Sequence, residues 1–201
     1  MLTHGNIVSN FLAVAPISGY GTKHRAMSFL PLCHIYERTL NYMYQYLGMS
    51  ICYATPLERV GEMIREVRPH VFCSVPRFLE KVWSRFTDAG YDKPWPVRAI
   101  FSYAIRLASE FKTNGNNNIW YRFRLAVIRL LIFRKLKKRM GSRIEIIVSG
   151  SAALQPKLAR GFWAAGIKVL EGYGLTETSP VIAVNRKTKN QFKIGTVGPV
   201  I

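Results

Sequence analysis

Short apolar runs alternate with amphipathic stretches along most of the chain, and this alternation is the main guide to its fold. The runs are rich in Val, Ile, Leu and Phe, and each is closed by glycine, proline, serine or threonine, as is usual for buried strands. We expect strands over residues 27–32, 49–53, 71–75, 144–149 and 168–171.

Helical periodicity fills the segments around these strands, because apolar positions recur there three or four residues apart. Thr3 is a suitable N-cap for a helix that runs to Val14, and Pro156 suits the first turn of another helix. The helix that begins at Pro156 is expected to span residues 156–165, and the other expected helices span residues 57–67, 77–86, 97–111 and 119–140. The asparagine-rich stretch 114–118 is expected to be a surface loop between two helices. Strand–helix alternation indicates an α/β fold, in which helices flank a sheet.

Composition limits the size and the class of the protein. The 201 residues are 49% hydrophobic and 20% charged, which suffices for one domain, or the larger part of one, with a sizeable core. The longest apolar stretch, from Leu125 to Phe133, is interrupted by Arg129 and is too short to span a bilayer. The polar opening of the chain does not resemble a signal peptide.

The cysteines suggest a reducing compartment. Three cysteines spaced about twenty residues apart fit neither a zinc site nor a disulfide framework. We therefore expect them to be reduced core residues of a cytosolic protein. They are Cys33, Cys52 and Cys73.

The formal net charge of +18 comes from 29 Lys and Arg against 11 Asp and Glu. Such a field attracts nucleic acid, anionic lipid or nucleotide phosphates, unless acidic residues in a longer protein balance it. Nine basic residues and no acid fall within residues 119–143, scattered around the expected helix as is unusual for a membrane-surface helix. The basic cluster between Lys135 and Arg143 is either a solvated helix end or a contact with anionic membrane or an acidic partner.

Two glycine-containing turns carry the candidate chemistry. The first follows the strand at 144–149 and contains Gly150, Ser151 and Ala152, small residues that let a ligand approach the backbone near a helix N-terminus. Most turns of this kind only connect a strand to a helix. By itself this pattern therefore fits either a ligand-binding turn or a simple connection.

The second turn follows the strand at 168–171 and is richer in functional groups. Thr176 can donate to a phosphate oxygen through its hydroxyl and its backbone N–H. Glu177 is a hard oxygen ligand of the kind that Mg²⁺ takes beside a nucleotide. Tyr173, between two glycines, can lay its ring against a planar base. The alternative is a hairpin turn with a capping threonine and a packed tyrosine.

Several segments resemble the adenylate-forming enzymes, a superfamily of acyl-CoA synthetases, luciferases and peptide-synthetase adenylation domains. YGLTETSP at 173–180 resembles their signature loop, and SGSAAL at 149–154 resembles the nucleotide-contacting turn before it. MLTHGNIVSN, at the start, resembles the stretch after the family's phosphate-binding loop. LPLCHIYER at 30–38 and IFRKLKKRMG at 132–141 resemble long-chain fatty-acid–CoA ligases. The resemblance covers essentially the whole chain and implies part of the large N-terminal domain, with mixed sheets flanked by helices.

The resemblance also implies residue roles around a bound nucleotide. Thr176 would hold the α-phosphate and Glu177 would bind Mg²⁺. The adenine pocket would be lined by Gly172 and Tyr173, with Ser151 and Ala152 on its other wall. The remaining residues of the expected nucleotide site are Gly150, Glu171, Gly174 and Leu175.

A second set of roles concerns the acyl substrate. His34 would lie beside the acyl carboxylate and the channel for the thiol, unless it is simply a histidine satisfied at a helix start. Tyr36, Glu37 and Arg38 fall where long-chain enzymes place a gate to the fatty-acyl tunnel.

The implied reaction uses ATP, Mg²⁺ and coenzyme A to activate a long-chain fatty acid as acyl-AMP and then to transfer the acyl group to the thiol. The expected location is the cytoplasm, with peripheral contact at the inner face of a membrane, and no nucleic-acid partner is expected. The alternatives are a ligase of other acyl specificity, or a non-catalytic basic module that binds lipid or nucleic acid.

The family's phosphate-binding loop and its C-terminal domain have no counterpart in the sequence, and would lie upstream and downstream of a partial AMP-binding domain at residues 1–201. The 201 residues alone are therefore expected not to complete the reaction.

Overall fold

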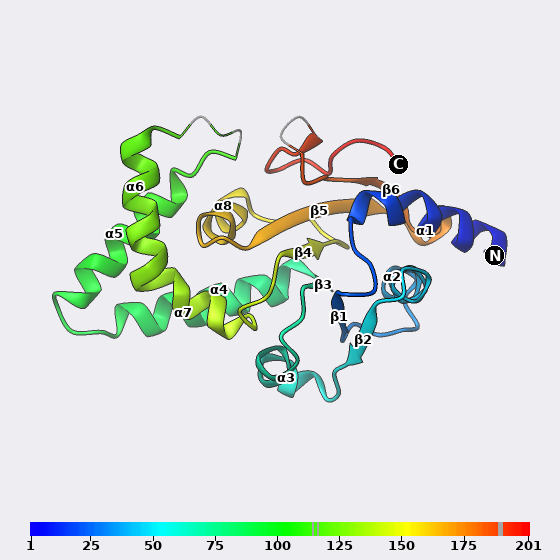
Figure 1. The fold of residues 1–201 in the computed structure, drawn as a ribbon, viewed down its shortest axis with the longest axis horizontal. Helices are drawn as coiled ribbons and strands as arrows, with labels where there is room; N and C mark the ends of the chain where they lie inside the picture. The colour runs from blue at the N-terminus through cyan, green and yellow to red at the C-terminus, as the bar shows by residue number, and fades with distance from the viewer. Residues whose placement is uncertain (114, 116, 189–190) are drawn as a thin grey trace.

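A six-stranded sheet forms the centre of the computed structural model, which describes residues 1–113, 115, 117–188 and 191–201 (Figure 1). Its strand order is β2-β1-β3-β4-β5-β6, with β1 to β5 parallel and β6 antiparallel to β5. This confirms the predicted α/β class with a mixed sheet. The strands are β1 Arg25–Ser28, β2 Ser50–Tyr53, β3 Val71–Ser74, β4 Ile146–Ser149, β5 Lys168–Gly174 and β6 Val181–Val184.

Helices connect the strands and cover both faces of the sheet. Thr3 caps the first helix as predicted, since its side-chain oxygen accepts a hydrogen bond from the Asn6 backbone N–H at 3.2 Å. Pro156 begins α8, also as predicted. The α-helices are α1 His4–Ser18, α2 Ile35–Tyr46, α3 Val60–Val67, α4 Pro76–Tyr91, α5 Val97–Ser109, α6 Ile119–Ile128, α7 Arg134–Arg139 and α8 Pro156–Ala164. Short 3-10 helices η1 Leu57–Arg59 and η3 Thr176–Thr178, and the π-helical turn η2 Arg129–Phe133, complete the description.

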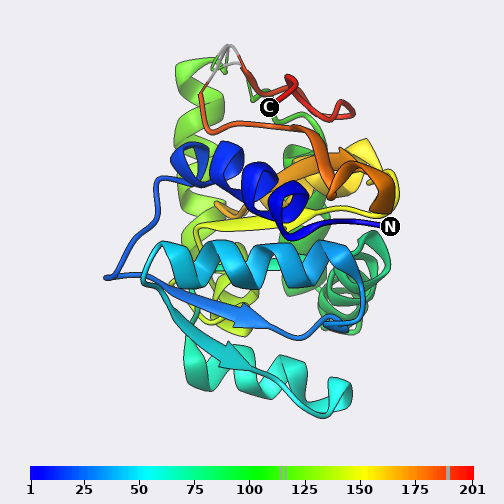
Figure 2. The same cartoon turned by 90° about the vertical axis from the view of Figure 1, so that its right-hand side faces the viewer.

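Alternate residues of each strand pack against different layers, which explains why both faces of the sheet are apolar. On one face, Ala26, Val71 and Ile146 belong to a core shared with α1 and α2. On the other face, Met27 and Phe72 belong to the larger core under the remaining helices. Figure 2 shows α1 and α2 side by side over the first face.

The structure corrects several predicted boundaries. The first strand lies at Arg25–Ser28, earlier than the expected 27–32, and β5 continues beyond residue 171 to Gly174. Helix α2 and strand β6 were missing from the predicted elements. The expected long helix at 119–140 is formed by α6, η2 and α7 in succession, so it contains a π-helical turn. The expected loop at 114–118 lies partly outside the described residues.

The cysteine prediction is confirmed in one respect and wrong in another. All three cysteines are free, but only Cys73 is buried in the core. Cys33 is exposed and Cys52 is half-buried, so they are not core residues. Among the described residues, no helix is long and apolar enough to cross a membrane.

Candidate functional site

The predicted site segments follow the carboxyl ends of parallel strands, so the topology brings them to one edge of the sheet. The turn at Gly150 and Ser151 follows β4, and the loop containing Thr176 and Glu177 follows β5, which is hydrogen-bonded to β4. His34 comes six residues after the end of β1, at the N-terminus of α2. This edge is where open α/β sheets bind their ligands.

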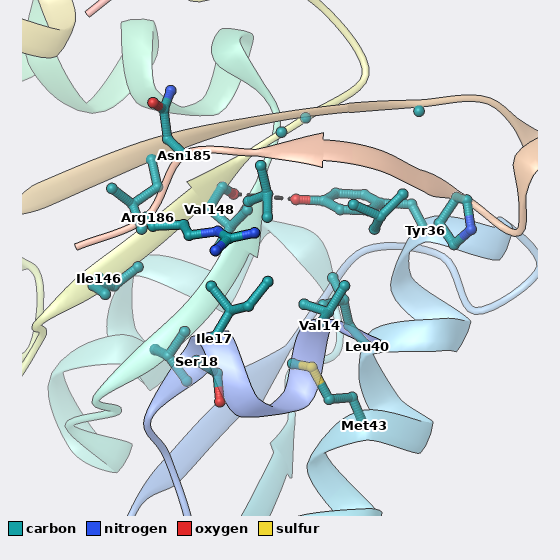
Figure 3. A pocket seen from close by; sticks show the side chains of 18 of the residues that line it. Val14, Ile17, Ser18, Tyr36, Leu40, Met43, Ile146, Val148, Asn185 and Arg186 are labelled. Carbon is teal, nitrogen blue, oxygen red and sulfur yellow. Dashed lines mark hydrogen bonds between the residues drawn. The ribbon is translucent and has the colours of Figure 1, made fainter. Parts of the chain in front are cut away.

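An apolar pocket opens between this part of the sheet and helices α1 and α2 (Figure 3). About 930 Å³ of space is not filled by protein here, a volume that includes open solvent at the mouth of the pocket. Val14 and Ile17 come from α1, and Leu40 and Met43 come from α2. The sheet supplies Ile146, Val148, Leu170 and Val184. The lining also includes residues of the two predicted site segments, namely Gly150, Ser151, Gly172, Tyr173 and Gly174.

Tyr36 links the pocket to the turn after β4. Its hydroxyl donates a hydrogen bond to the Val148 carbonyl at 3.3 Å, drawn as a dashed line in Figure 3. A Cβ atom at position 150 would lie 3.0 Å from the tyrosine ring, so Gly150 allows this close approach. Burial raises the pKa of Tyr36 well above its ordinary value. Tyr36 is therefore a neutral, fixed part of the pocket wall.

The loop after β5 is the connection of a β-hairpin, because β6 returns antiparallel to β5. The Thr178 hydroxyl accepts a hydrogen bond from the Leu175 N–H at 2.9 Å and donates to the Pro180 carbonyl at 2.6 Å. Thr176 and Glu177 are exposed at the tip. The hairpin alternative and the ligand-binding reading are thus compatible, since Thr178 shapes the loop and leaves the other two groups free to meet a ligand.

Asn10 of α1 is hydrogen-bonded to the end of this loop, and no sequence motif pointed to it. Its side-chain N–H group donates to the carbonyls of Val181 at 2.8 Å and Thr178 at 3.3 Å. Its side-chain oxygen accepts from the Val181 N–H at 3.1 Å. One amide side chain therefore fixes both ends of the segment that follows Glu177.

Replacing Asn10 with alanine is expected to loosen the hairpin loop, because the Val181 N–H and two carbonyls lose their partner. Leaving such groups unpaired costs about 1–3 kcal/mol. Amide hydrogen exchange at Val181 should accelerate by roughly tenfold or more. Ser9→Ala is the matched control on the same helix, since the Ser9 hydroxyl bonds only its own helix at Asn6. Equal exchange in the two variants would contradict the assigned role of Asn10.

Glu171, expected in the nucleotide site, uses its carboxylate inside the protein. One oxygen accepts from the Leu154 N–H at 3.3 Å and the other from the Gly195 N–H at 3.2 Å. Burial raises the pKa of Glu171, and these two hydrogen bonds act in the opposite direction. Glu171 therefore ties the turn after β4 to the segment near residue 195.

Glu37, expected at an acyl gate, is buried beside β1 and does not line the pocket. It accepts hydrogen bonds from the Ser28 hydroxyl at 2.5 Å and from the Asn41 side chain at 3.4 Å. Burial raises the pKa of Glu37 to about 7, although both hydrogen bonds act to lower it. The structure places Glu37 in a buried polar cluster.

His34 and Arg38 both lie at the surface, outside the pocket wall. His34 occupies the N-cap position of α2 without a side-chain capping bond. The Arg38 guanidinium donates to the Leu32 carbonyl at 2.9 Å. Of the four expected acyl-site residues, only Tyr36 lines the pocket, and the roles of the other three stay predictions.

The described residues could bind a magnesium ion only together with a ligand that supplies further oxygen atoms. Nowhere in the described ranges do three or more His, Cys, Asp or Glu side chains gather as metal ligands. Glu177 supplies a single exposed carboxylate beside the Thr176 hydroxyl. Mg²⁺ characteristically binds one or two carboxylates together with phosphate oxygens and water, so Glu177 suits an ion that arrives with a nucleotide.

The glycine turn after β4, the hydroxyl-rich loop after β5 and an apolar pocket thus lie at one edge of the sheet, an arrangement that suits the binding of a small molecule. Residues 1–201 match the family model described as AMP-binding enzyme, and the chain belongs to that family.

Individual relatives agree with this family. The chain is 31% identical to long chain acyl-CoA synthetase 7, a peroxisomal protein of Arabidopsis thaliana, over 91% of its own length and 26% of the relative's. The solved structure of a fatty acyl-CoA synthetase from Mycobacterium tuberculosis covers 99% of the chain, with 17% identity and a TM-score of 0.64, and 30% of that structure is matched. The structure of O-succinylbenzoate CoA synthetase from Bacillus subtilis was solved with ATP and magnesium. It is 16% identical to the chain with a TM-score of 0.62, and the match covers 99% of the chain and 32% of that structure.

The two structural likenesses show the shared fold, which is that of N-terminal domains of adenylate-forming enzymes. The chain spans about a quarter of the length of the Arabidopsis relative that it matches.

Proposed function

We propose that this chain forms the signature loop, the nucleotide-contacting turn and the acyl pocket of an enzyme that converts a long-chain fatty acid into its coenzyme A thioester through acyl-AMP. The observation that carries the proposal is the pocket between α1, α2 and the sheet. Its lining is mainly apolar, with Asn185, Arg186 and Lys187 among the polar members. It also includes Gly150, Tyr173 and Gly174, which belong to the two expected nucleotide-binding segments. An apolar tail inside would thus leave its carboxylate near the nucleotide.

In the first step, a carboxylate oxygen of the fatty acid attacks the α-phosphorus of ATP, the bond to the bridging oxygen of pyrophosphate breaks, and acyl-AMP forms. Thr176 would donate to an α-phosphate oxygen, and Tyr173 would stack on adenine. Mg²⁺, held by Glu177 and the phosphates, would neutralise charge on the leaving pyrophosphate. The loop contributes mainly by positioning, which depends on Thr178 and Asn10.

In the second step, the thiol sulfur of coenzyme A attacks the acyl carbonyl, its proton is released, and the bond to AMP breaks. His34, which is exposed at the start of α2, is the expected neighbour of this reaction. The apolar pocket would hold the acyl chain through both steps and so keep the anhydride in place until the thiol arrives.

Filling the pocket should change the preferred length of the acid. Ile17 lines the pocket from α1, and Ile17→Trp adds bulk inside it. In the enzyme that contains this chain, kcat/KM for palmitate should fall by at least about tenfold, while that for a short acid should change much less, since pocket volume governs discrimination among apolar substrates. The measurement is acid-dependent pyrophosphate release with ATP and magnesium.

Leu12→Trp provides the matched control, because Leu12 lies exposed on the same helix. It should leave the preference for palmitate unchanged. An equal loss with long and short acids would place the acyl chain elsewhere. Activity that is highest with a short or aromatic acid in the unaltered enzyme would favour a ligase of other acyl specificity.

A further inference from the structure

Polar contacts connect helix α2 to three neighbouring strands of the sheet. Tyr36 contacts β4 as described above, and the Tyr44 hydroxyl lies 3.4 Å from the Cys73 sulfur of β3. The Glu37 carboxyl group accepts a hydrogen bond from the Ser28 hydroxyl, at the end of β1. Because β1, β3 and β4 are adjacent in the sheet, the three contacts together fix how α2 lies across it.

The position of α2 determines the shape of the candidate acyl pocket. Tyr36, Leu40 and Met43 line the pocket from this helix, and Ile146 and Val148 line it from the sheet (Figure 3). A helix moves largely as a unit, because backbone hydrogen bonds hold its successive turns together. A change at the contact between α2 and β1 therefore reaches the wall of the pocket.

Glu37, Asn41 and Ser28 form a buried polar cluster in which two oxygen atoms have no hydrogen-bond partner. Glu37 is 1% exposed, and the Asn41 side-chain N–H group donates to the Ser28 hydroxyl at 3.0 Å and to the Glu37 main-chain carbonyl at 2.8 Å. Glu37 Oε2 and Asn41 Oδ1 lack a partner within the described part of the chain, where no cation pairs with Glu37 either. The cluster therefore has two unused acceptors and lacks a donor.

A neutral carboxyl group suits this cluster better than a carboxylate. A buried charge without a cation is costly, whereas a protonated carboxyl group adds one O–H donor. The titratable groups that face Glu37 are Tyr36 and Tyr44 of α2 and Cys73 of β3. Burial raises the pKa of all three, so none carries a charge near neutral pH. Burial also raises the pKa of Glu37 to about 7, against the lowering effect of its two hydrogen bonds.

We propose that Glu37 is a positioning residue, whose neutral carboxyl group holds α2 against the sheet and so keeps the pocket in the shape that binds a long acyl chain. The identity of the substrate rests on the proposed function, whereas the contacts of α2 do not. Ionisation of Glu37 leaves a charge among neutral groups, and water reaches that charge when the start of α2 moves away from β1. Because Tyr36 is the preceding residue, this movement also displaces the pocket wall.

The direction of the pH dependence follows from the raised pKa of Glu37. Its value of about 7 in the folded protein exceeds the ordinary value of 4.5, so the folded protein keeps a proton that the unfolded chain has lost. The stabilisation by this proton is fully present below the ordinary value and is lost as the pH rises through about 7. The contact between α2 and β1 is therefore intact at about pH 6 and weakened at about pH 8.5.

The proposal is tested by acid-dependent pyrophosphate release in the enzyme that contains this chain, with palmitate and with a short acid. Between about pH 6 and about pH 8.5, kcat/KM for palmitate relative to the short acid should fall by about tenfold or more, as the fraction with neutral Glu37 falls. The ratio cancels effects of pH on the nucleotide and the metal. Glu37→Gln keeps the shape without the charge, so its ratio should stay constant.

Two further variants separate this contact from other effects of pH. Glu66→Gln removes an exposed carboxylate on α3 and should show the same fall in the ratio as the unaltered enzyme. Ser28→Ala leaves Glu37 in place but removes a hydrogen bond that lowers its pKa. The fall in the ratio should therefore move to higher pH in Ser28→Ala.

Amide hydrogen exchange of α2 tests the same contact without reference to catalysis. At about pH 8.5, and after correction for the intrinsic effect of pH, exchange in α2 should be roughly tenfold faster in the unaltered enzyme than in Glu37→Gln. At about pH 6 the two proteins should exchange at the same rate, because Glu37 is then neutral.

The proposal is overturned if Glu37→Gln and the unaltered enzyme show the same pH dependence of the ratio, whatever the exchange rates are. Equal exchange of α2 in the two proteins at the higher pH overturns it as well. If neither palmitate nor the short acid supports pyrophosphate release at either pH, the proposed function fails, and the exchange rates alone decide whether neutral Glu37 holds α2.

Discussion

Replacing Glu177 with alanine in the enzyme that contains this chain is expected to lower kcat by about 10²-fold or more while leaving the fold intact. The carboxylate is exposed at the tip of the β5–β6 loop, and the hydrogen bonds that shape this loop belong to Thr178 and Asn10. Its removal would therefore take away charge from the proposed nucleotide and metal site, with little effect on stability. Pyrophosphate release at saturating magnesium, together with thermal melting, separates these two effects.

A second exposed carboxylate provides the control for Glu177. Glu66 lies on α3 and is not part of the pocket or the loop, so Glu66→Ala should retain the normal rate. A Glu177→Ala enzyme with normal kcat at saturating magnesium would remove Glu177 from the proposed metal site. A large drop in melting temperature would instead assign it a structural role.

Gly174→Ala is expected to destabilise the protein by about 3 kcal/mol, because overpacking against fixed backbone cannot be relieved by a rotamer change. A Cβ atom at this position would lie 1.7 Å from the Pro180 carbonyl oxygen and 3.0 Å from the Val181 Cα. The hairpin must therefore open, which displaces Thr176 and Glu177 as well. The melting temperature should fall by roughly 10 °C for a chain of this size.

Gly172 tests whether this cost comes from the specific contact or from any added methyl group in β5. A Cβ atom there would meet its nearest neighbour at 3.7 Å, which is ordinary van der Waals contact. Gly172→Ala should change the free energy of unfolding by less than about 1 kcal/mol. Similar melting temperatures for the two variants would show that the loop relaxes around position 174 without strain.

Elements with a simple pattern of buried apolar residues could be predicted from the sequence, and elements with buried polar residues could not. Strands β3 and β4 are runs of buried residues, and their positions were predicted well. Helix α2 was missed because its inward face includes the buried polar residues Glu37, Thr39 and Asn41. Strand β6 was missed because it directly follows Pro180, the last residue of the loop after β5.

In the candidate site, continuous segments could be predicted from the sequence, whereas contacts between residues far apart in the sequence could not. The turn after β4 and the loop after β5 are continuous segments, so their glycines and hydroxyls could be recognised as motifs. Asn10 could not be recognised, because its partner Val181 lies 171 residues away and only the fold brings them together. The pocket was equally hidden, since its walls come from α1, α2 and four strands.

The path of the chain between β3 and β4 has a consequence for how such proteins diverge. The chain leaves the sheet after Ser74, forms α4 to α7, and returns beside the same strand, where Ser74 pairs with Ser149. That pairing fixes both attachment points of the helical lobe. Insertions, deletions or surface changes in the lobe therefore need not shift the strand end that carries the expected nucleotide-binding turn. Lineages are therefore free to fit this lobe to different cellular surroundings while they keep one chemistry.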